Sequence, residues 1–298
     1  GHSCMLLLAA LVWGVAFVAQ SEGLNYVGAF TFNTCRFILG GAVLIPCIYF
    51  LHGRKDSAWQ TLSEKEKKEQ TRMGIIGGIC CGCILCLASC LQQFGIAQTT
   101  VGKAGFITTL YIIIVPFMGL FLKKKIGINI WISAVIAAVG MYFLCITESF
   151  SIGAGDRLVL MCSVVFSVHI LVIDHFSPKA DGVVISCVQF FTAGVIASVL
   201  MLLFEHPSMS AVIAAAAPIL YAGVMSCGVG YTLQVVAQNG VDPTVASLLL
   251  SLESVFSVLA GWMLLGQKLS GRELFGCVLV FAAVLLVQIP TEKLFHTA

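Results

Sequence analysis

The chain has 298 residues, of which 59% are hydrophobic and 10% are charged, and its formal net charge is +2. Soluble globular proteins carry about 25% charged residues, so this composition excludes a water-soluble enzyme and a nucleic-acid-binding protein. The mean hydropathy of +1.02 predicts instead an all-α protein that spans a membrane.

Ten stretches of the chain are apolar and long enough to cross a bilayer, which takes roughly 20 mostly apolar residues. We therefore expect ten transmembrane helices. In chain order they are Met5–Gln20, Thr31–Leu51, Met73–Ala97, Gly102–Leu122, Ile128–Ile146, Arg157–Phe176, Val183–Phe204, Ala211–Gln238, Thr244–Gly266 and Glu273–Ile289.

The ten stretches fall into two similar sets of five. Leu6–Gln20 reappears 153 positions later as Val159–Ile173, and Asn33–Gly41 reappears as Ser186–Gly194. Later stretches repeat at an offset of roughly 140 to 143 positions, because a charged insert lengthens the first set. Many secondary transporters are built from duplicated halves, with the substrate site between them near mid-bilayer.

The repeat divides the chain into residues 1–150, with an insert at 52–72, and residues 151–298. Basic residues gather in cytoplasmic loops, and here they lie after the second and fourth spans. Because each half has five spans, an odd number, the second half should run through the membrane upside down. We expect two inverted five-helix repeats, with both termini and the insert in the cytoplasm.

The insert itself has the pattern of a short amphipathic surface helix over 55–71. Ser63 and Glu66 have the spacing of a capping box, and Glu64 and Lys68 form an i,i+4 pair of opposite charge.

Most of the 13 cysteines lie inside the apolar stretches, where free cysteine behaves as a small hydrophobe. Cys83, Cys86 and Cys90 share a helix face, but no histidine or acid joins them in that segment. Structural sites of this type normally come from loops, so we expect no metal and no cofactor.

Several short motifs resemble the ten-span EamA branch of the drug/metabolite transporter superfamily along the whole chain. They are Trp13-Gly14-x-x-Phe17, Arg36-Phe37-x-x-Gly40, Gly102-Lys103-Ala104-Gly105-Phe106, Gly155-Asp156, and Ser251-Leu252-Glu253 with Gly266-Gln267. The resemblance implies a transporter, but it leaves the substrate open, because the family moves amino acids, nucleotides, sugars and amphipathic cations. Ser254 and Gln267 stand where the family often has Pro and Glu.

Glu253 is the first candidate for chemistry inside a span. An ionisable group at mid-membrane costs at least about 2.5–3.5 kcal/mol unless it is compensated. Its apolar neighbours favour the protonated form of a carboxyl, which would allow Glu253 to couple proton movement to solute movement. The alternative is a structural carboxyl that stays protonated and hydrogen-bonds a neighbouring helix.

Arg36 is the second ionisable candidate. It could hold a substrate carboxylate through a bidentate pair, or it could be structural and extend toward the membrane surface. Its repeat partner, Gln189, is neutral, so only one half carries the charge.

The remaining candidates are polar or aromatic side chains that would line a substrate site. Amides facing a cavity would bind zwitterions or sugars, whereas amides facing helices would add only about 0.6 kcal/mol each to packing. An aromatic side chain could face a cation or a ring, and a histidine could sense pH. The predicted substrate-binding set is Glu253, Tyr111, Gln92, Gln93, Gln234, Trp13, His169 and Gln189, with Arg36 either structural or a carboxylate ligand.

We expect a secondary transporter of small amino acid-like or amphipathic solutes that works by alternating access and exports its solute, either as a proton antiporter or as a facilitator. Uptake of a nutrient by the same machine stays open, because a carrier follows its gradients. A membrane-embedded transferase of lipid-linked groups would need clustered acids around a metal, and the chain has no Asp-Asp pair. The expected partners are a small solute, protons and the lipid of the cytoplasmic membrane, in a monomer or homodimer.

Overall fold

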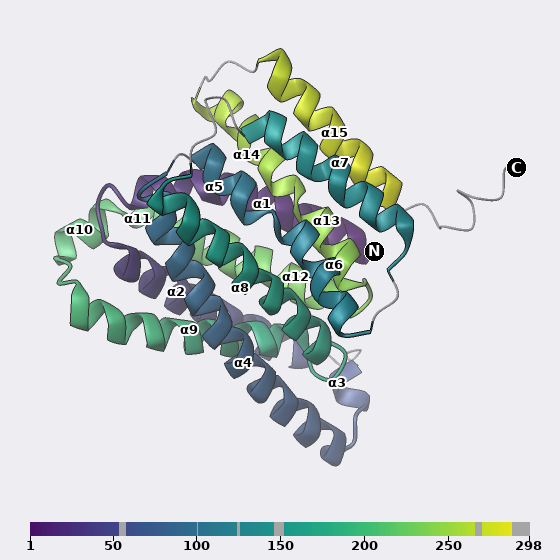
Figure 1. Cartoon of the computed structure of the whole chain (residues 1–298). Coiled ribbons are helices and arrows are strands. Elements are labelled where there is room, and N and C mark those ends of the chain that lie inside the picture. Colours follow the sequence, from purple (N-terminus) through teal and green to yellow (C-terminus); the bar gives the residue numbers. More distant parts are fainter. Residues whose placement is uncertain (54–57, 100, 124–125, 146–151, 266–269, 288–298) are drawn as a thin grey trace, which may run out of the picture.

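The computed structural model describes residues 1–53, 58–99, 101–123, 126–145, 152–265 and 270–287, and within them all regular structure is helical (Figure 1). The expectation of an all-α protein is therefore confirmed. In chain order the helices are α1 His2–Gly23, α2 Ala29–Gly53, α3 Ala58–Thr61, α4 Glu64–Ile96, α5 Val101–Thr108, α6 Tyr111–Phe121, α7 Ile128–Cys145, α8 Ala154–Phe176, α9 Gly182–Phe204, α10 Met209–Ala214, α11 Ala216–Leu220, the π-helix η1 Tyr221–Tyr231, α12 Thr232–Gln238, α13 Pro243–Leu250, α14 Leu252–Leu265 and α15 Gly271–Val287.

Eight helical stretches of the described chain are long and apolar enough to cross a membrane. They are α1, α2, α4, Ala104–Phe121, α8, α9, Ala216–Gln238 and Pro243–Ala260. In addition, α7 is apolar over the shorter stretch Ile128–Phe143, and α15 has 17 residues. The chain is thus a multi-pass membrane protein. It has ten spans if α7 and α15 also cross the membrane.

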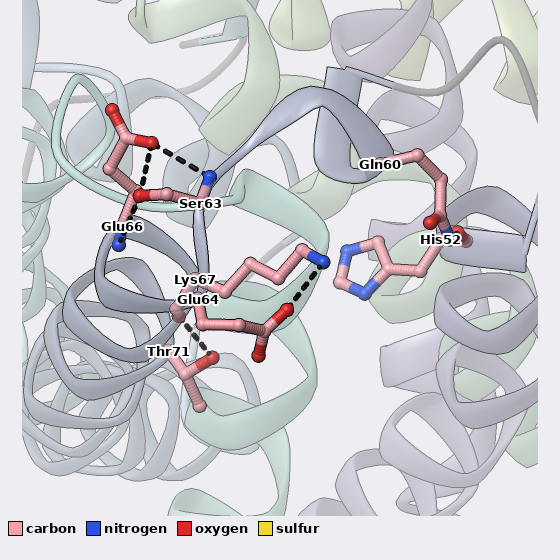
Figure 2. Close-up of polar contacts among 7 residues, drawn as sticks. All are labelled: His52, Gln60, Ser63, Glu64, Glu66, Lys67 and Thr71. Carbon is pink, nitrogen blue, oxygen red and sulfur yellow. Dashed lines mark hydrogen bonds and ion pairs between the residues drawn. The ribbon is translucent and has the colours of Figure 1, made fainter.

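The predicted capping box at the end of the insert is confirmed (Figure 2). The Ser63 hydroxyl accepts a hydrogen bond from the Glu66 backbone N–H at 3.3 Å, and the Glu66 carboxylate accepts one from the Ser63 N–H at 2.8 Å. Glu64 pairs with Lys67 at 3.0 Å, one residue earlier than the predicted partner Lys68.

The described part of the insert does not form one surface helix, so the expectation of a helix over 55–71 is wrong: the short helix α3 ends at Thr61, and Ser63 caps a second helix. The helix that Ser63 caps is α4, which runs without a break from Glu64 to Ile96 and carries the third span. Its first turns are rich in Lys, Glu and Gln, which are good helix formers, and no Gly or Pro stops the helix before the span. Residues 54–57 lie outside the described residues.

Two spans that the sequence presents as continuous are broken near their middle. The first break lies between α5 and α6, where the Thr109 hydroxyl bonds the carbonyls of Gly105 at 2.9 Å and Phe106 at 3.0 Å. The second lies at Ser251 between α13 and α14, where the hydroxyl donates to the Leu248 carbonyl at 2.7 Å. Side chains that bond back to the preceding turn often bend helices.

The eighth predicted span is also irregular. It consists of the short helices α10 and α11, the π-helix η1 and α12. η1 covers 11 residues and contains Gly223, Gly228 and Gly230. π-helical turns are rare and often occur at functional sites.

Glycines set the spacing between α4 and α9. A Cβ atom at Gly78 would lie 2.5 Å from the Cβ of Val188, and one at Gly82 would lie 2.6 Å from the carbonyl oxygen of Gln189. Small residues allow this close approach in a membrane, where lipid gives helices no hydrophobic drive to associate.

α2 and α9 run antiparallel and contact each other at both ends. The Glu205 carboxylate, just after α9, accepts hydrogen bonds from the backbone N–H groups of Phe30 at 3.0 Å and Thr31 at 2.8 Å, at the start of α2. At the opposite ends, His52 Nε2 near the end of α2 lies 2.8 Å from the carboxylate of Asp181, the N-cap of α9. We call these two contacts the end clamps.

α7 and α15 lie side by side (Figure 1) and also run antiparallel. Gly140 of α7 packs against Gly276 of α15. Two residues further along α7, the Tyr142 ring lies 5.4 Å from the guanidinium of Arg272, four residues earlier in α15. Moving forward along α7 therefore means moving backward along α15, as in an antiparallel pair.

Candidate functional site

A cavity in the interior of the bundle is lined by both halves of the chain. Its volume is about 40 Å³. A water molecule needs roughly 10–15 Å³ of such a volume, so the cavity has room for a few waters. We call it the central cavity; its lining residues are Trp13, Ala16, Phe17, Gln20, Arg36, Gln92, Thr108, Tyr111, Phe166, His169, Ile170, Ser226, Tyr231, Gln234, Leu250 and Glu253.

The structure brings most of the predicted site residues to this cavity. Trp13, Arg36, Gln92, Tyr111, His169, Gln234 and Glu253 all line it.

Gln93 and Gln189 do not line the cavity; they lie fully buried behind its wall. Gln93 Nε2 donates a hydrogen bond to the backbone carbonyl of Gln20 at 3.2 Å, and Gln189 Oε1 lies 3.1 Å from His169 Nε2. Each of them therefore contacts a lining residue instead of facing the cavity.

Glu253 and Tyr111 meet inside the cavity. The Tyr111 hydroxyl donates a hydrogen bond to Glu253 Oε1 at 3.0 Å, and each residue is only 4% exposed. Each lies just after the break in its span, Tyr111 at the start of α6 and Glu253 at the second position of α14. Discontinuous spans commonly form the substrate sites of secondary transporters.

Arg36 reaches the cavity from α2 and, among the described residues, makes one hydrogen bond to a side chain. Its Nη1 donates to Gln20 Oε1 at 3.2 Å, and its guanidinium lies 4.8 Å from the ring centre of Phe37 and 5.8 Å from that of Phe32. In the described part of the chain, Nε and Nη2 have no hydrogen-bond partner and no carboxylate lies within 4.0 Å of the guanidinium. The residue is 2% exposed, so its positive charge lies inside the bundle next to a neutral amide.

Aromatic rings form another part of the wall. The rings of Trp13 and Tyr231 lie 4.5 Å apart, and the His169 ring is 6.1 Å from that of Tyr231. Trp13 Nε1 also donates to the backbone carbonyl of Ser226 in η1 at 3.3 Å. The wall therefore joins α1 to the π-helix.

Polar atoms around the cavity retain free hydrogen-bonding capacity. His169 Nδ1 and Gln234 Oε1 are buried without a partner among the described residues. Gln92 Nε2 makes a long hydrogen bond of 3.4 Å to the Thr108 hydroxyl. Buried polar atoms are normally satisfied, so these atoms are suited to bind water or a polar solute.

The sequence prediction missed some lining residues. Gln20 is a polar residue within the first span, so the criterion that selected Gln92 and Gln234 would also have found it. Ser226 contributes a backbone carbonyl that becomes available to Trp13 in a π-helix, and no side-chain pattern signals that.

Cysteine and acidic side chains do not gather into a ligand set in the described residues. No three His, Cys, Asp or Glu side chains there are placed to hold a metal ion. Cys86 and Cys90 are buried, whereas Cys80 and Cys83 are exposed.

A multi-pass bundle with broken spans around a polar cavity is the architecture of a membrane transport protein. Comparison with known proteins gives the same class and a particular family. The chain belongs to the EamA-like transporter family, whose family model matches it twice, at residues 2–146 and 153–289. Membership identifies a transporter and not an enzyme.

Individual relatives agree with this family. The chain is 29% identical over 285 residues to an uncharacterized transporter of Archaeoglobus fulgidus, covering 95% of this chain and 84% of that protein. It is 20% identical over 286 residues to the uncharacterized transporter YoaV of Bacillus subtilis, covering 94% of each chain. A solved structure titled "Crystal structure of protein" shares the fold, with a TM-score of 0.77, 17% identity, and coverage of 99% of this chain and 98% of that one.

Proposed function

We propose that the protein is a secondary carrier of small solutes across the cytoplasmic membrane, with its substrate site in the central cavity. The observation that carries this proposal is that two buried ionisable residues, Arg36 and Glu253, line one cavity to which both halves of the chain contribute. Such groups are costly inside a membrane unless they serve a pathway or are compensated. The amide and aromatic side chains around them fit amino acid-like or amphipathic solutes.

The carrier would work by alternating access between two inverted five-span repeats, residues 1–150 and 151–298. The double match of the family model supports this division. The antiparallel packing of α2 on α9 and of α7 on α15 supports the inversion, because each pair joins repeat-equivalent spans. The span breaks at Thr109 and Ser251 are 142 positions apart, within the repeat offset of the sequence.

This arrangement makes α7 and α15 the fifth and tenth spans. Basic residues then favour cytoplasmic termini and a cytoplasmic insert. The carrier would act as a monomer or homodimer.

Glu253 is the proposed coupling group. A proton that binds its carboxyl on one side of the membrane and leaves on the other would drive solute in the opposite direction, so that inward proton flow exports the solute. The hydrogen bond from Tyr111 supports this role, because a phenol O–H stabilises the ionised carboxylate when the proton has left. Uptake is the same cycle run along reversed gradients.

Counterflow in liposomes tests this function. Purified protein is reconstituted, loaded with one unlabelled solute at a time from a panel of amino acids, nucleobases, sugars and quaternary amines, and supplied outside with the same solute in labelled form. We expect at least one amino acid-like or amphipathic solute to accumulate transiently, and to accumulate at a rate that depends on pH. Protein-free liposomes are the control, and the absence of counterflow for every solute would contradict the proposal.

A further inference from the structure

Arg36 is a cation that the fold orients but does not neutralise. It is 2% exposed, and its only hydrogen-bonded side chain among the described residues is that of Gln20, an amide without charge. A buried charge in a membrane is normally paired. No carboxylate of the described residues contacts the guanidinium, which is therefore free to bind the anion of a solute.

The atoms that Gln20 leaves free define the shape of that anion. Arg36 Nη1 donates its hydrogen bond to Gln20 Oε1, while Nε and Nη2 of Arg36 have no partner among the described residues. The N–H bonds of Nε and Nη2 point to the same side of a guanidinium and form one of its two-pronged edges. That edge matches the two oxygens of a carboxylate, which arginine binds with two parallel hydrogen bonds.

Gln20 is itself held in place. It is 4% exposed, it lines the central cavity near the end of α1, and its backbone carbonyl accepts a hydrogen bond from Gln93 Nε2 of α4 at 3.2 Å. The backbone at Gln20 is thus tied to α4, and from this fixed position the side-chain amide reaches Nη1 of Arg36.

We infer that Gln20 is a specificity-determining residue: by holding Arg36 without neutralising it, Gln20 reserves the free edge of the guanidinium for a solute carboxylate. Together with Glu253 in the same cavity, which can attract an ammonium group, this selects small zwitterions of the α-amino acid type. The inference rests on the proposed carrier function and names the substrate class of that site. Gln189, at the repeat-equivalent position of Arg36, is a neutral amide that lies 3.1 Å from His169 Nε2, so the second half has no guanidinium at this position and one orientation of the solute is favoured.

The test replaces the neutral amide with an internal anion. Binding of the twenty standard L-amino acids to purified full-length protein is measured, and the tightest is compared with its methyl ester, which lacks the carboxylate. In the natural protein we expect the ester to bind roughly 10- to 100-fold more weakly, as for the loss of a charge-assisted bidentate pair. In Gln20→Glu the new carboxylate pairs with Arg36, so the amino acid and its ester should bind equally weakly.

Three further variants separate this role from a structural one. Arg36→Gln, which installs the side chain found at the repeat-equivalent position, should also abolish the preference for the free carboxylate. Gln20→Met removes the acceptor without adding charge, so it should weaken amino acid binding but keep part of the preference. Gln238→Glu places a carboxyl at another buried amide, which contacts the Ile170 carbonyl and does not line the cavity; it should lower the melting temperature and keep the preference.

The outcomes distinguish this inference from the proposed function. If Gln20→Glu still prefers the amino acid to its ester as strongly as the natural protein does, Gln20 does not set the specificity, and the carrier proposal stands. Counterflow of solutes that lack a carboxylate, with no amino acid bound, would likewise overturn the inference alone. If no amino acid binds and no solute shows counterflow, both proposals fail.

Discussion

Glu253 and Tyr111 show how a duplicated chain can build an asymmetric site from single residues. They lie 142 positions apart, which is the repeat offset of their spans, and they share a hydrogen bond of 3.0 Å. The two halves therefore supply a carboxyl and a phenol at equivalent places, and the cavity receives one acid instead of two. Two carboxyls so close together would repel each other when both are ionised.

Replacing Glu253 with glutamine tests the coupling role. The amide keeps the size and the acceptor for the Tyr111 hydroxyl, but it cannot take up and release a proton. We expect Glu253→Gln to keep the melting temperature within a few degrees, to retain counterflow, and to flatten the dependence of flux on pH in proteoliposomes.

Two control variants sharpen that measurement. Glu69→Gln removes an exposed carboxylate at the charged start of α4 and should leave the pH dependence unchanged. Tyr111→Phe removes only the donor to Glu253, so it should shift the pH dependence without abolishing it. A natural pH dependence in Glu253→Gln would remove this residue as the coupling group.

For single residues, the sequence predicts best the position of side chains that would cost much free energy if they faced the lipid. Arg36 and Glu253 could be chosen because an ionisable group in a span has to face the bundle interior, and both do. The position of an amide side chain is less constrained, because it can form its hydrogen bonds in a contact between helices as well as in a cavity. For that reason Gln92 and Gln234 line the cavity while Gln93 and Gln189 lie behind it.

Among the elements, the contact of α4 with α9 depends on the absence of a side chain. A methyl group at Gly82 would lie 2.6 Å from both the Gln189 carbonyl and the Thr192 Cβ, and α9 would have to move. We expect Gly82→Ala to destabilise the protein by about 1–3 kcal/mol, the usual range for overpacking, which a lower melting temperature in detergent would reveal.

Gly105→Ala is the matched control for this substitution. Gly105 also lies in a helix, α5, but a Cβ atom there would meet nothing within 4 Å. Alanine is a better helix former than glycine by about 1 kcal/mol, so the melting temperature should stay the same or rise. An equal loss in both variants would show that helix spacing is not the cause.

The contact between α1 and the π-helix gives a second test at this scale. Trp13 donates to the Ser226 carbonyl beside the cavity, and Tyr221 donates to the Val12 carbonyl at 2.9 Å without lining the cavity. We expect Trp13→Phe and Tyr221→Phe each to cost about 1 kcal/mol of stability. Only Trp13→Phe should also weaken solute binding, measured as the dissociation constant of the tightest ligand; equal binding losses would contradict this view of the wall.

Hydrophobic length identifies the spans but not their internal irregularities. The breaks at Thr109 and Ser251 occur inside apolar stretches that contain no proline at those positions. Serine and threonine occur often in unbroken membrane helices, so their presence does not predict a break. The same reasoning applies to η1, which packs against α1 and α2, because contacts between residues so far apart in the chain cannot be read from the local pattern.

For the whole molecule, the proposed inversion of the repeats has a direct consequence for loop placement. The loop at Leu24–Gly28 and the loop at 177–181 are repeat-equivalent, with an offset of 153, yet they lie at opposite ends of α2. We expect an epitope tag in the first to bind antibody on intact spheroplasts, and a tag in the second to bind only after permeabilisation. Binding of both without permeabilisation would contradict the inverted arrangement.

The end clamps also bear on which parts of the protein can move. Glu205 and His52 are themselves repeat-equivalent, 153 positions apart. Glu205, just after α9, bonds the start of α2, and His52, near the end of α2, bonds the start of α9. Two antiparallel helices that are bonded to each other at both ends resist sliding and tilt as one unit. The α2–α9 pair would then stay in place during transport, and the broken spans would move relative to it. That movement would expose the bound solute first to one side of the membrane and then to the other.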